Sequence, residues 1–258
     1  MKYKGTLAVA LILIAAFIYL SGGSFFIDLG TLYKLAFTAN QPLNLLAHMT
    51  IHTGYAHLIE NLTTFIVFAL IAETVLVSAD IVIIFFLSGA AAAILFIFLN
   101  PNVALIGASA GISGILGNAL VLNPKKAIPA LILVPLLLSV IILPLATGQY
   151  VVFQEKLDEQ KKEISTQVVE AEQRGDVNAV KELTQQLVNV EQKKVQQEQG
   201  VQFQSTTPSD AAVHGFGALF GILYVFILRQ KKLEEGVECY KELYHEILVF
   251  FKLESKKK

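Results

Sequence analysis

The chain of 258 residues has little cysteine and little charge in its first half. Its one cysteine, Cys239, cannot form an intramolecular disulfide, so the fold must rest on helix packing. The formal net charge of −1 gives no indication of a nucleic-acid partner. Hydrophobic residues make up 54% of the chain and form runs long enough to cross a bilayer, which indicates a polytopic membrane protein.

Two further absences narrow the class of membrane protein. The first apolar run has no small-residue cleavage site and is followed by more apolar runs, so we expect a retained helix rather than a signal peptide. No internal repeat is visible, which argues against a transporter built from inverted repeats.

We predict an all-α protein that crosses the cell membrane several times. Six segments qualify as spans, namely residues 6–27, 57–77, 81–99, 108–122, 128–147 and 209–228. The positive-inside rule puts both termini in the cytoplasm, because basic residues gather at one set of span ends: Lys2, Lys4, Lys125, Lys126, Arg229, Lys231 and Lys232. Residues 28–56 and 148–208 then face outside.

The fourth span is too short to cross a bilayer. From Ser109 to Leu122 it has 14 residues, or roughly 21 Å of helix, against a hydrocarbon core of about 30 Å. Its N-terminus should therefore lie below the outer surface. Irregular backbone at that depth requires surrounding protein or a water-filled cavity, and residues 100–102 fit a loop leading into one.

The charged residues gather after Tyr150 and define three further parts of the chain. Residues 151–200 are rich in Glu, Gln and Lys with heptad-like apolar spacing, which predicts an outer, coiled-coil-like helical hairpin that breaks at Gly175 and Asp176. We divide the chain into five spans in 1–150, the hairpin in 151–200, the sixth span in 201–231, and an amphipathic cytoplasmic tail in 232–258.

Polar side chains inside spans are costly and are therefore candidates for function. His57 and Asn61 lie one turn apart on the second span, so both donors share one helix face. Ser109, Ser113 and Gly117 share a face of the fourth span. On the sixth span His214 shares a stripe with Gly217 and Gly221, and these small residues permit close helix packing.

Packing of the Gly117 face on the Gly217 and Gly221 face would bring Ser109 and His214 to the same depth. A serine hydroxyl becomes nucleophilic when a neighbouring neutral histidine takes its proton. His57, Asn61 and the free backbone N–H at Ser109 could stabilise an oxyanion. No span offers an aspartate to orient His214, so we expect a Ser-His dyad.

Three motifs in order, "HMTIHTGYAHLIENL", "GASAGISGILG" and "HGFGALFG", resemble the rhomboid intramembrane serine proteases. The resemblance extends over essentially all six spans, and it includes His48, His52 and the glutamate Glu73 at the end of the second span. It implies cleavage of single-span membrane proteins near the outer end of the span, with no cofactor and no metal. We expect the hairpin of 151–200 to recruit or filter substrates, or to bind an unidentified partner.

The family's Gly-x-Ser-Gly pattern is split in this chain, because Ala110 follows Ser109 while Ser113 is followed by Gly114. Register against the following Pro124 favours Ser109 as the nucleophile. The alternative function is a catalytically inactive rhomboid-like protein that binds transmembrane helices, although such relatives usually lack the serine or the histidine. A metal site at His48, His52 and His57 is disfavoured, because "HLIEN" is not a His-Glu-x2-His motif.

Overall fold

The computed structural model describes residues 3–206 and 211–255, which fold mainly as helices. The elements are α1 (Lys4–Ser21), α2 (Leu29–Leu35), the short 3₁₀ helices η1 (Pro42–Leu45) and η2 (Ala47–Thr50), α3 (Tyr55–Ala72), α4 (Ser78–Leu99), α5 (Ser109–Leu122), α6 (Pro124–Leu137), a π-helical turn η3 (Leu138–Ile142), α7 (Leu143–Gln173), α8 (Val177–Thr206), α9 (Ala211–Leu228) and α10 (Gln230–Ser255).

The helices are those of a multi-pass membrane protein. Within the described residues, five helices are long and apolar enough to span a bilayer: α1, α3, α4, the continuous helix Pro124–Gln173, and α9. The predicted short helix begins at Ser109 and ends at Leu122, as expected from the sequence. Residues 209 and 210, predicted to open the last span, lie outside the described residues.

The short helix α5 lies at the centre of the bundle, in contact with α3, α4, α6, α9 and α10. Most of its residues are buried, and many are small. Small side chains let neighbouring helices pack closely around a central one. The adjoining core is built from large apolar side chains of α3 and α4, among them Phe65, Phe68 and Phe85.

Polar contacts fix the direction in which the helices run. The carboxylate of Glu73, just after α3, accepts hydrogen bonds from the backbone N–H groups of Gly5 and Thr6 at the start of α1, at 3.1 and 3.0 Å. Asn123, just after α5, donates to the Thr74 hydroxyl at 3.2 Å. These ends lie together and form what we call the Glu73 end of the bundle.

The opposite end, which we call the Ser109 end, holds the start of α5. The 22 residues of α4 measure about 33 Å and the 14 residues of α5 about 21 Å. Because α5 ends at the Glu73 end, its first residue lies inside the bundle rather than level with the far end of α4. The predicted recessed N-terminus of this helix follows from its length.

The fifth span differs from the prediction at its outer boundary. The sequence divides at residue 150, where apolar residues give way to charged ones, but α6, η3 and α7 form one continuous helix through this point. Pro129 and Pro135 lie inside α6, and the π-helical turn follows them. A proline cannot donate the backbone hydrogen bond of a regular helix, and a local π-helical adjustment is one way in which a membrane helix accommodates it.

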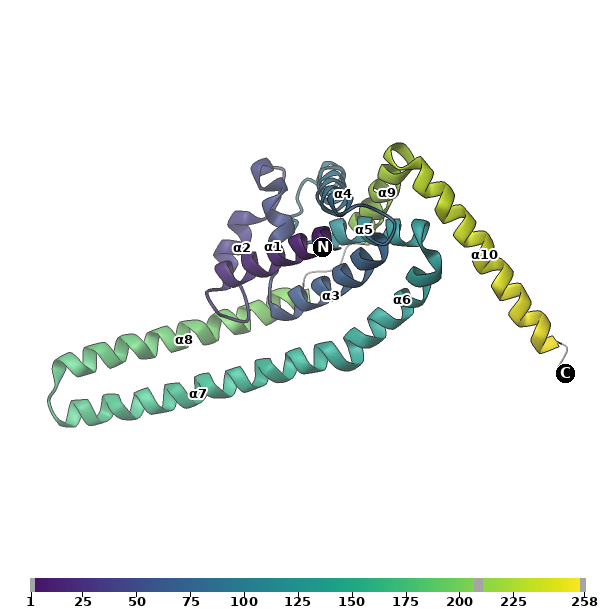
Figure 1. Cartoon of the computed structure of the whole chain (residues 1–258). Coiled ribbons are helices and arrows are strands. Elements are labelled where there is room, and N and C mark those ends of the chain that lie inside the picture. The colour runs from purple at the N-terminus through teal and green to yellow at the C-terminus, as the bar shows by residue number, and fades with distance from the viewer. Residues whose placement is uncertain (1–2, 207–210, 256–258) are drawn as a thin grey trace.

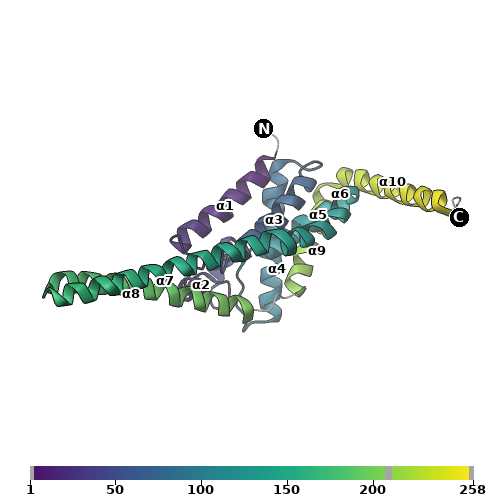
Figure 2. The same cartoon turned by 90° about the horizontal axis from the view of Figure 1, so that it is seen from below.

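Two long extensions leave the bundle (Figures 1 and 2). Helices α7 and α8 run side by side away from it on one side, and α10 projects on the other. Gly175 takes a positive φ of 69° at the turn before α8, and Asp176 accepts a hydrogen bond from the backbone N–H of Ala179. Ion pairs join α7 to α8 at Lys161–Glu191 and Asp158–Lys194.

Candidate active site

The contact between α5 and α9 is made by residues that lack large side chains. A Cβ added to Gly217 would collide with the carbonyl of Ala110, and one added to Gly221 would collide with the backbone of Gly114. A Cβ on Gly117 would meet the Ala218 carbonyl oxygen at 3.0 Å. The two backbones therefore approach as closely as glycine permits. The sequence predicted that Gly217 and Gly221 would meet the Gly117 face, but they meet Ala110 and Gly114, while Gly117 faces Ala218.

This contact also sets the register between the two helices. Ala110 and Gly114 lie four residues apart on α5 and face Gly217 and Gly221, which lie four residues apart on α9. The helices therefore run parallel and in step. His214 precedes Gly217 by about one turn, so it lies level with the start of α5, where Ser109 is the first residue.

The loop entering α5 is held against the bundle by glycine and histidine backbone. Gly107 has a φ of 115°, which L side chains rarely adopt, and a Cβ there would stand 3.2 Å from Cε1 of His57. The Gly107 N–H donates to the His48 carbonyl at 2.9 Å. The His57 ring therefore lies against the loop that precedes Ser109.

A second set of contacts orients His57. Its Nδ1 hydrogen-bonds with the Thr53 hydroxyl at 3.1 Å, and the edge of the His52 ring packs on it with centroids 5.1 Å apart. The Nε2 atom is the one nearer Gly107. Helix α3, which carries His57, and helix α9, which carries His214, both pack on α5.

Hydrogen-bond donors converge on this point from two elements. The side chain of Asn61 is buried, and its Nδ2 has no partner among the described residues. No side chain caps the N-terminus of α5. The first backbone N–H groups of a helix have no partner within the helix, and the helix dipole makes this end favourable for negative charge.

The two candidate serines differ in their hydrogen bonding. The Ser113 hydroxyl donates to the Ser109 carbonyl one turn back, at 2.9 Å. This is the ordinary behaviour of a serine inside a helix. For the Ser109 hydroxyl no hydrogen bond is found within residues 3–206 and 211–255. The choice of Ser109 over Ser113 as nucleophile stays a prediction.

His48 and His52 lie in the loop before α3. Burial lowers the pKa of His48 to about 4, and its ring stacks on Phe37. Burial, together with the neighbouring His57, lowers the pKa of His52 to about 3. Both rings are therefore neutral near pH 7. Among the described residues no group of three or more His, Cys, Asp or Glu side chains gathers in a way that could hold a metal ion.

Sequence reasoning missed two residues of this site. Thr53 fixes one ring nitrogen of His57, and Gly107 supplies the positive φ that lets the loop pass His57. The glycine two residues before Ser109 was a usable signal for the second. The role of Thr53 depends on a bend between η2 and α3 that no spacing rule predicts.

The short helix α5, which begins with Ser109 and is packed inside a multi-pass bundle, is the centre of the candidate site. Comparison with known protein families identifies the domain to which it belongs. Residues 39–160 match the Rhomboid domain, so the chain contains a rhomboid domain over these residues. The match includes His57, Asn61 and Ser109 but ends within α7, before His214. No curated protein matched the chain, and no solved structure did.

The glycine contact makes a prediction with an internal control. Gly217→Ala should lower the melting temperature in detergent, because its Cβ would collide with the Ala110 carbonyl, and overpacking of this kind costs about 1–3 kcal/mol. Gly215→Ala in the same helix meets nothing within 4 Å and should be neutral or slightly stabilising. Equal melting temperatures for the two variants would contradict the close packing of α5 on α9.

Proposed function

We propose that the chain is an intramembrane serine endopeptidase that cleaves transmembrane segments of single-span membrane proteins. The rhomboid domain supports the proposal, because the sequence motifs resemble those of the rhomboid proteases. The main support for the proposal is the parallel packing of α5 on α9. In this packing His214 lies at the same height along the bundle as the first turn of α5, which holds Ser109.

In this proposal the Ser109 hydroxyl oxygen attacks the substrate carbonyl carbon while His214 takes the hydroxyl proton. The carbonyl oxygen becomes an oxyanion that accepts hydrogen bonds from Asn61, His57 and the backbone N–H of Ser109. His214 then gives the proton to the leaving amide nitrogen as the C–N bond breaks. Water hydrolyses the resulting acyl-enzyme by the same route in reverse.

The dyad requires that His214 act without a carboxylate partner. The acidic residue Asp80 is engaged by Arg229 instead, at the Glu73 end of the bundle. A neutral imidazole still accepts a proton from serine near pH 7. Nδ1 of His57 is engaged by the Thr53 hydroxyl, so the proposal assigns the oxyanion contact to Nε2.

The proposed topology has six crossings, with α5 as a recessed fourth one. Both termini are assigned to the cytoplasm of the cell membrane, since Lys4, Lys125 and Arg229 flank the Glu73 end. The Ser109 end then faces outside, where water can enter. A substrate helix must unwind locally before its carbonyl can be attacked, because its own hydrogen bonds occupy that carbonyl.

The nucleophile is tested by three single substitutions. Ser109→Ala and His214→Ala should each reduce cleavage of a transmembrane substrate to background, whereas Ser113→Ala should stay within a few-fold, because Ser113 loses only one hydrogen bond to backbone. A fluorophosphonate should label Ser109, as read by peptide mass. An inactive Ser113→Ala beside a fully active Ser109→Ala would assign the nucleophile to Ser113. Absence of cleavage and labelling in the wild type would favour the helix-binding alternative.

The oxyanion role of Asn61 is tested by turnover. Asn61→Ala should lower kcat by about 10² to 10³, the usual cost of one oxyanion donor, with KM little changed. Asn118→Ala is the matched control, since Asn118 is also buried but lies nine residues into α5, and its kcat should be unaffected. Wild-type kcat in Asn61→Ala, with the chemical step rate-limiting, would exclude the role.

We further propose that α7 and α8 form an outer hairpin that selects substrates or binds a partner above the site. Its base is anchored by aromatic contacts, with Tyr150 and Phe153 packed on Phe25 at centroid distances of 6.0 and 5.0 Å. The part beyond this anchor makes most of its contacts within the helix pair, through the ion pairs Lys161–Glu191 and Asp158–Lys194. Such an appendage can be removed without breaking the anchor.

Replacing residues 158–194 with a short Gly/Ser turn retains Tyr150 and Phe153. Cleavage of a small generic substrate should stay within a few-fold, while the choice among full-length membrane proteins changes. Competition between two full-length substrates in proteoliposomes measures this choice. A shortened protein that melts normally yet cleaves nothing would show that the hairpin belongs to the catalytic machinery.

A further inference from the structure

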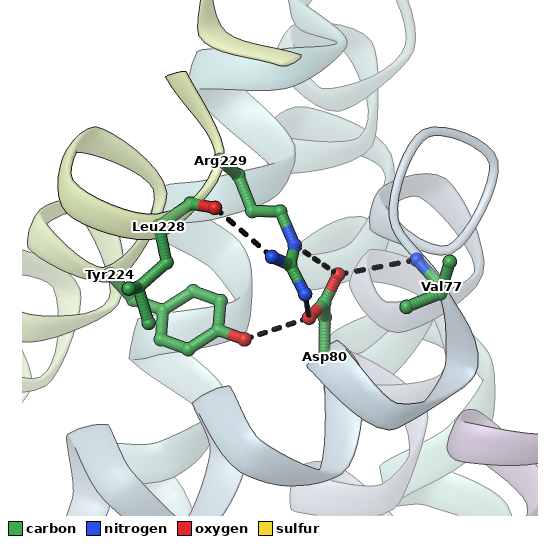
Figure 3. Close-up of polar contacts among 5 residues, drawn as sticks. All are labelled: Val77, Asp80, Tyr224, Leu228 and Arg229. Carbon is green, nitrogen blue, oxygen red and sulfur yellow. Dashed lines mark hydrogen bonds and ion pairs between the residues drawn. The ribbon is translucent and has the colours of Figure 1, made fainter. Parts of the chain in front are cut away.

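Asp80 is a buried carboxylate at the Glu73 end of the bundle, far along the chain from the residues it binds. Figure 3 shows the Arg229 guanidinium beside this carboxylate. Arg229 donates hydrogen bonds to it from Nε at 2.9 Å and from Nη2 at 2.6 Å, and the Tyr224 hydroxyl donates to it at 2.7 Å. Asp80 is 1% exposed. A bidentate guanidinium–carboxylate pair fixes direction as well as distance.

The pair holds the point at which α9 becomes α10. Arg229 is the residue between the end of α9 at Leu228 and the start of α10 at Gln230, and its Nη1 also donates to the Leu228 carbonyl at 3.0 Å. Beyond it, Tyr240 of α10 donates to the Leu120 carbonyl of α5 at 3.0 Å. The Glu73 ends of α4, α5 and α9 are therefore tied together by directional bonds.

The rest of the α5–α9 contact is of a different kind. Glycine and backbone meet there through van der Waals contact, which sets how close the helices come but has little directional preference. This contact sets the separation and the approximate register of the helices, but it resists small rotations of α9 less sharply than a directional bond does. A directional bond at one end of α9 is what would prevent them.

Movement of α9 at the Asp80 end would be felt at His214. Tyr224 lies ten residues after His214, or about 15 Å along the helix. His214, Gly217, Gly221 and Tyr224 lie along one side of α9. Since α9 is a rigid helix, its rotation at Tyr224 equals its rotation at His214.

We propose that Asp80 and Arg229 are positioning residues that fix the rotation and depth of α9 and so hold His214 opposite Ser109. This inference rests on the proposed protease function. The Asp80 carboxylate is buried, whereas the Arg229 side chain is 38% exposed. A half-exposed ion pair is a poor source of net stability, because the loss of hydration offsets much of the attraction, and neutral replacement of both partners is often tolerated. The geometric constraint is the larger contribution here, and it can be separated from stability.

The experiment uses Asp80→Asn/Arg229→Gln in the full-length protein in proteoliposomes, since neutralising both partners avoids leaving one buried charge. We expect kcat per titrated active site and the rate of fluorophosphonate labelling at Ser109 to fall about tenfold or more, because ångström-scale misplacement of a catalytic group costs up to about 10². KM should stay within about twofold, and the melting temperature should change little. Arg229→Lys, which keeps the charge but not the bidentate grip, should be intermediate.

Lys125→Gln is the matched control. It breaks the ion pairs of Lys125 with Glu242 and Glu246, which join α6 to α10 at the same end of the bundle without touching α9. Its kcat and labelling rate should equal those of the wild type. If the Asp80/Arg229 double variant folds and also keeps wild-type kcat and labelling, or loses only thermal stability, the positioning role is wrong.

A readout that needs no activity separates this inference from the protease proposal. In a Ser109→Cys, His214→Cys, Cys239→Ser protein, a short thiol-reactive cross-linker should join positions 109 and 214, and the yield should drop when Asp80→Asn/Arg229→Gln is added. An unchanged yield would overturn the positioning role. If the wild-type protein shows neither fluorophosphonate labelling nor substrate cleavage, the protease function is instead overturned.

Discussion

The bundle depends on one contact, the approach of the α5 backbone to the α9 backbone across glycine. Gly114 and Gly221 meet with no side chain between them, and Gly217 lies on the carbonyl of Ala110. Any side chain larger than hydrogen at these positions would separate the helices. Because α5 carries Ser109 and α9 carries His214, the distance between the proposed catalytic groups is set by residues that have no chemistry of their own.

A short central helix follows from the same constraint. The many small residues of α5 permit neighbours on every side, and its 14 residues leave its first turn inside the bundle. No side chain caps this N-terminus, so its first N–H groups have no partner within the helix. Small residues, short length and a recessed positive helix end together make a place where a developing negative charge can be held without a metal.

The sequence predicted those features that local chemistry determines. The bounds of α5 follow from a loop of Asn100, Pro101 and Asn102 before it and Pro124 after it, and the turn before α8 follows from Gly175 and Asp176. The glycine faces of α5 and α9 were predictable because their spacing puts them on one side of each helix. The family match supports this reading over residues 39–160 only, so the last span rests on its own spacing and packing.

Other features depend on contacts between distant segments and left no local pattern. Asp80 and Arg229 are 149 residues apart, and no local sequence pattern around either residue predicts that they pair. The continuity of α6 into α7 was missed because the sequence changes from apolar to charged residues near 150, whereas the backbone continues as one helix through this point. The polarity of a segment indicates whether water or lipid surrounds it, whereas the end of a helix is indicated by helix-breaking residues such as proline.

The buried polar groups of the bundle differ in how fully they are hydrogen-bonded. At the Glu73 end the carboxylates are engaged, Glu73 by Gly5 and Thr6, and Asp80 by Arg229 and Tyr224. At the Ser109 end, both ring nitrogens of His52 and the amide nitrogen of Asn61 have no hydrogen-bond partner within the described chain. An unmatched buried group of this kind costs about 1–3 kcal/mol. Asn118 Oδ1 in the second half of α5 is also without a partner within the described chain, so unsatisfied groups are not confined to one end. Among them, the Asn61 amide is the donor that the proposed chemistry would use.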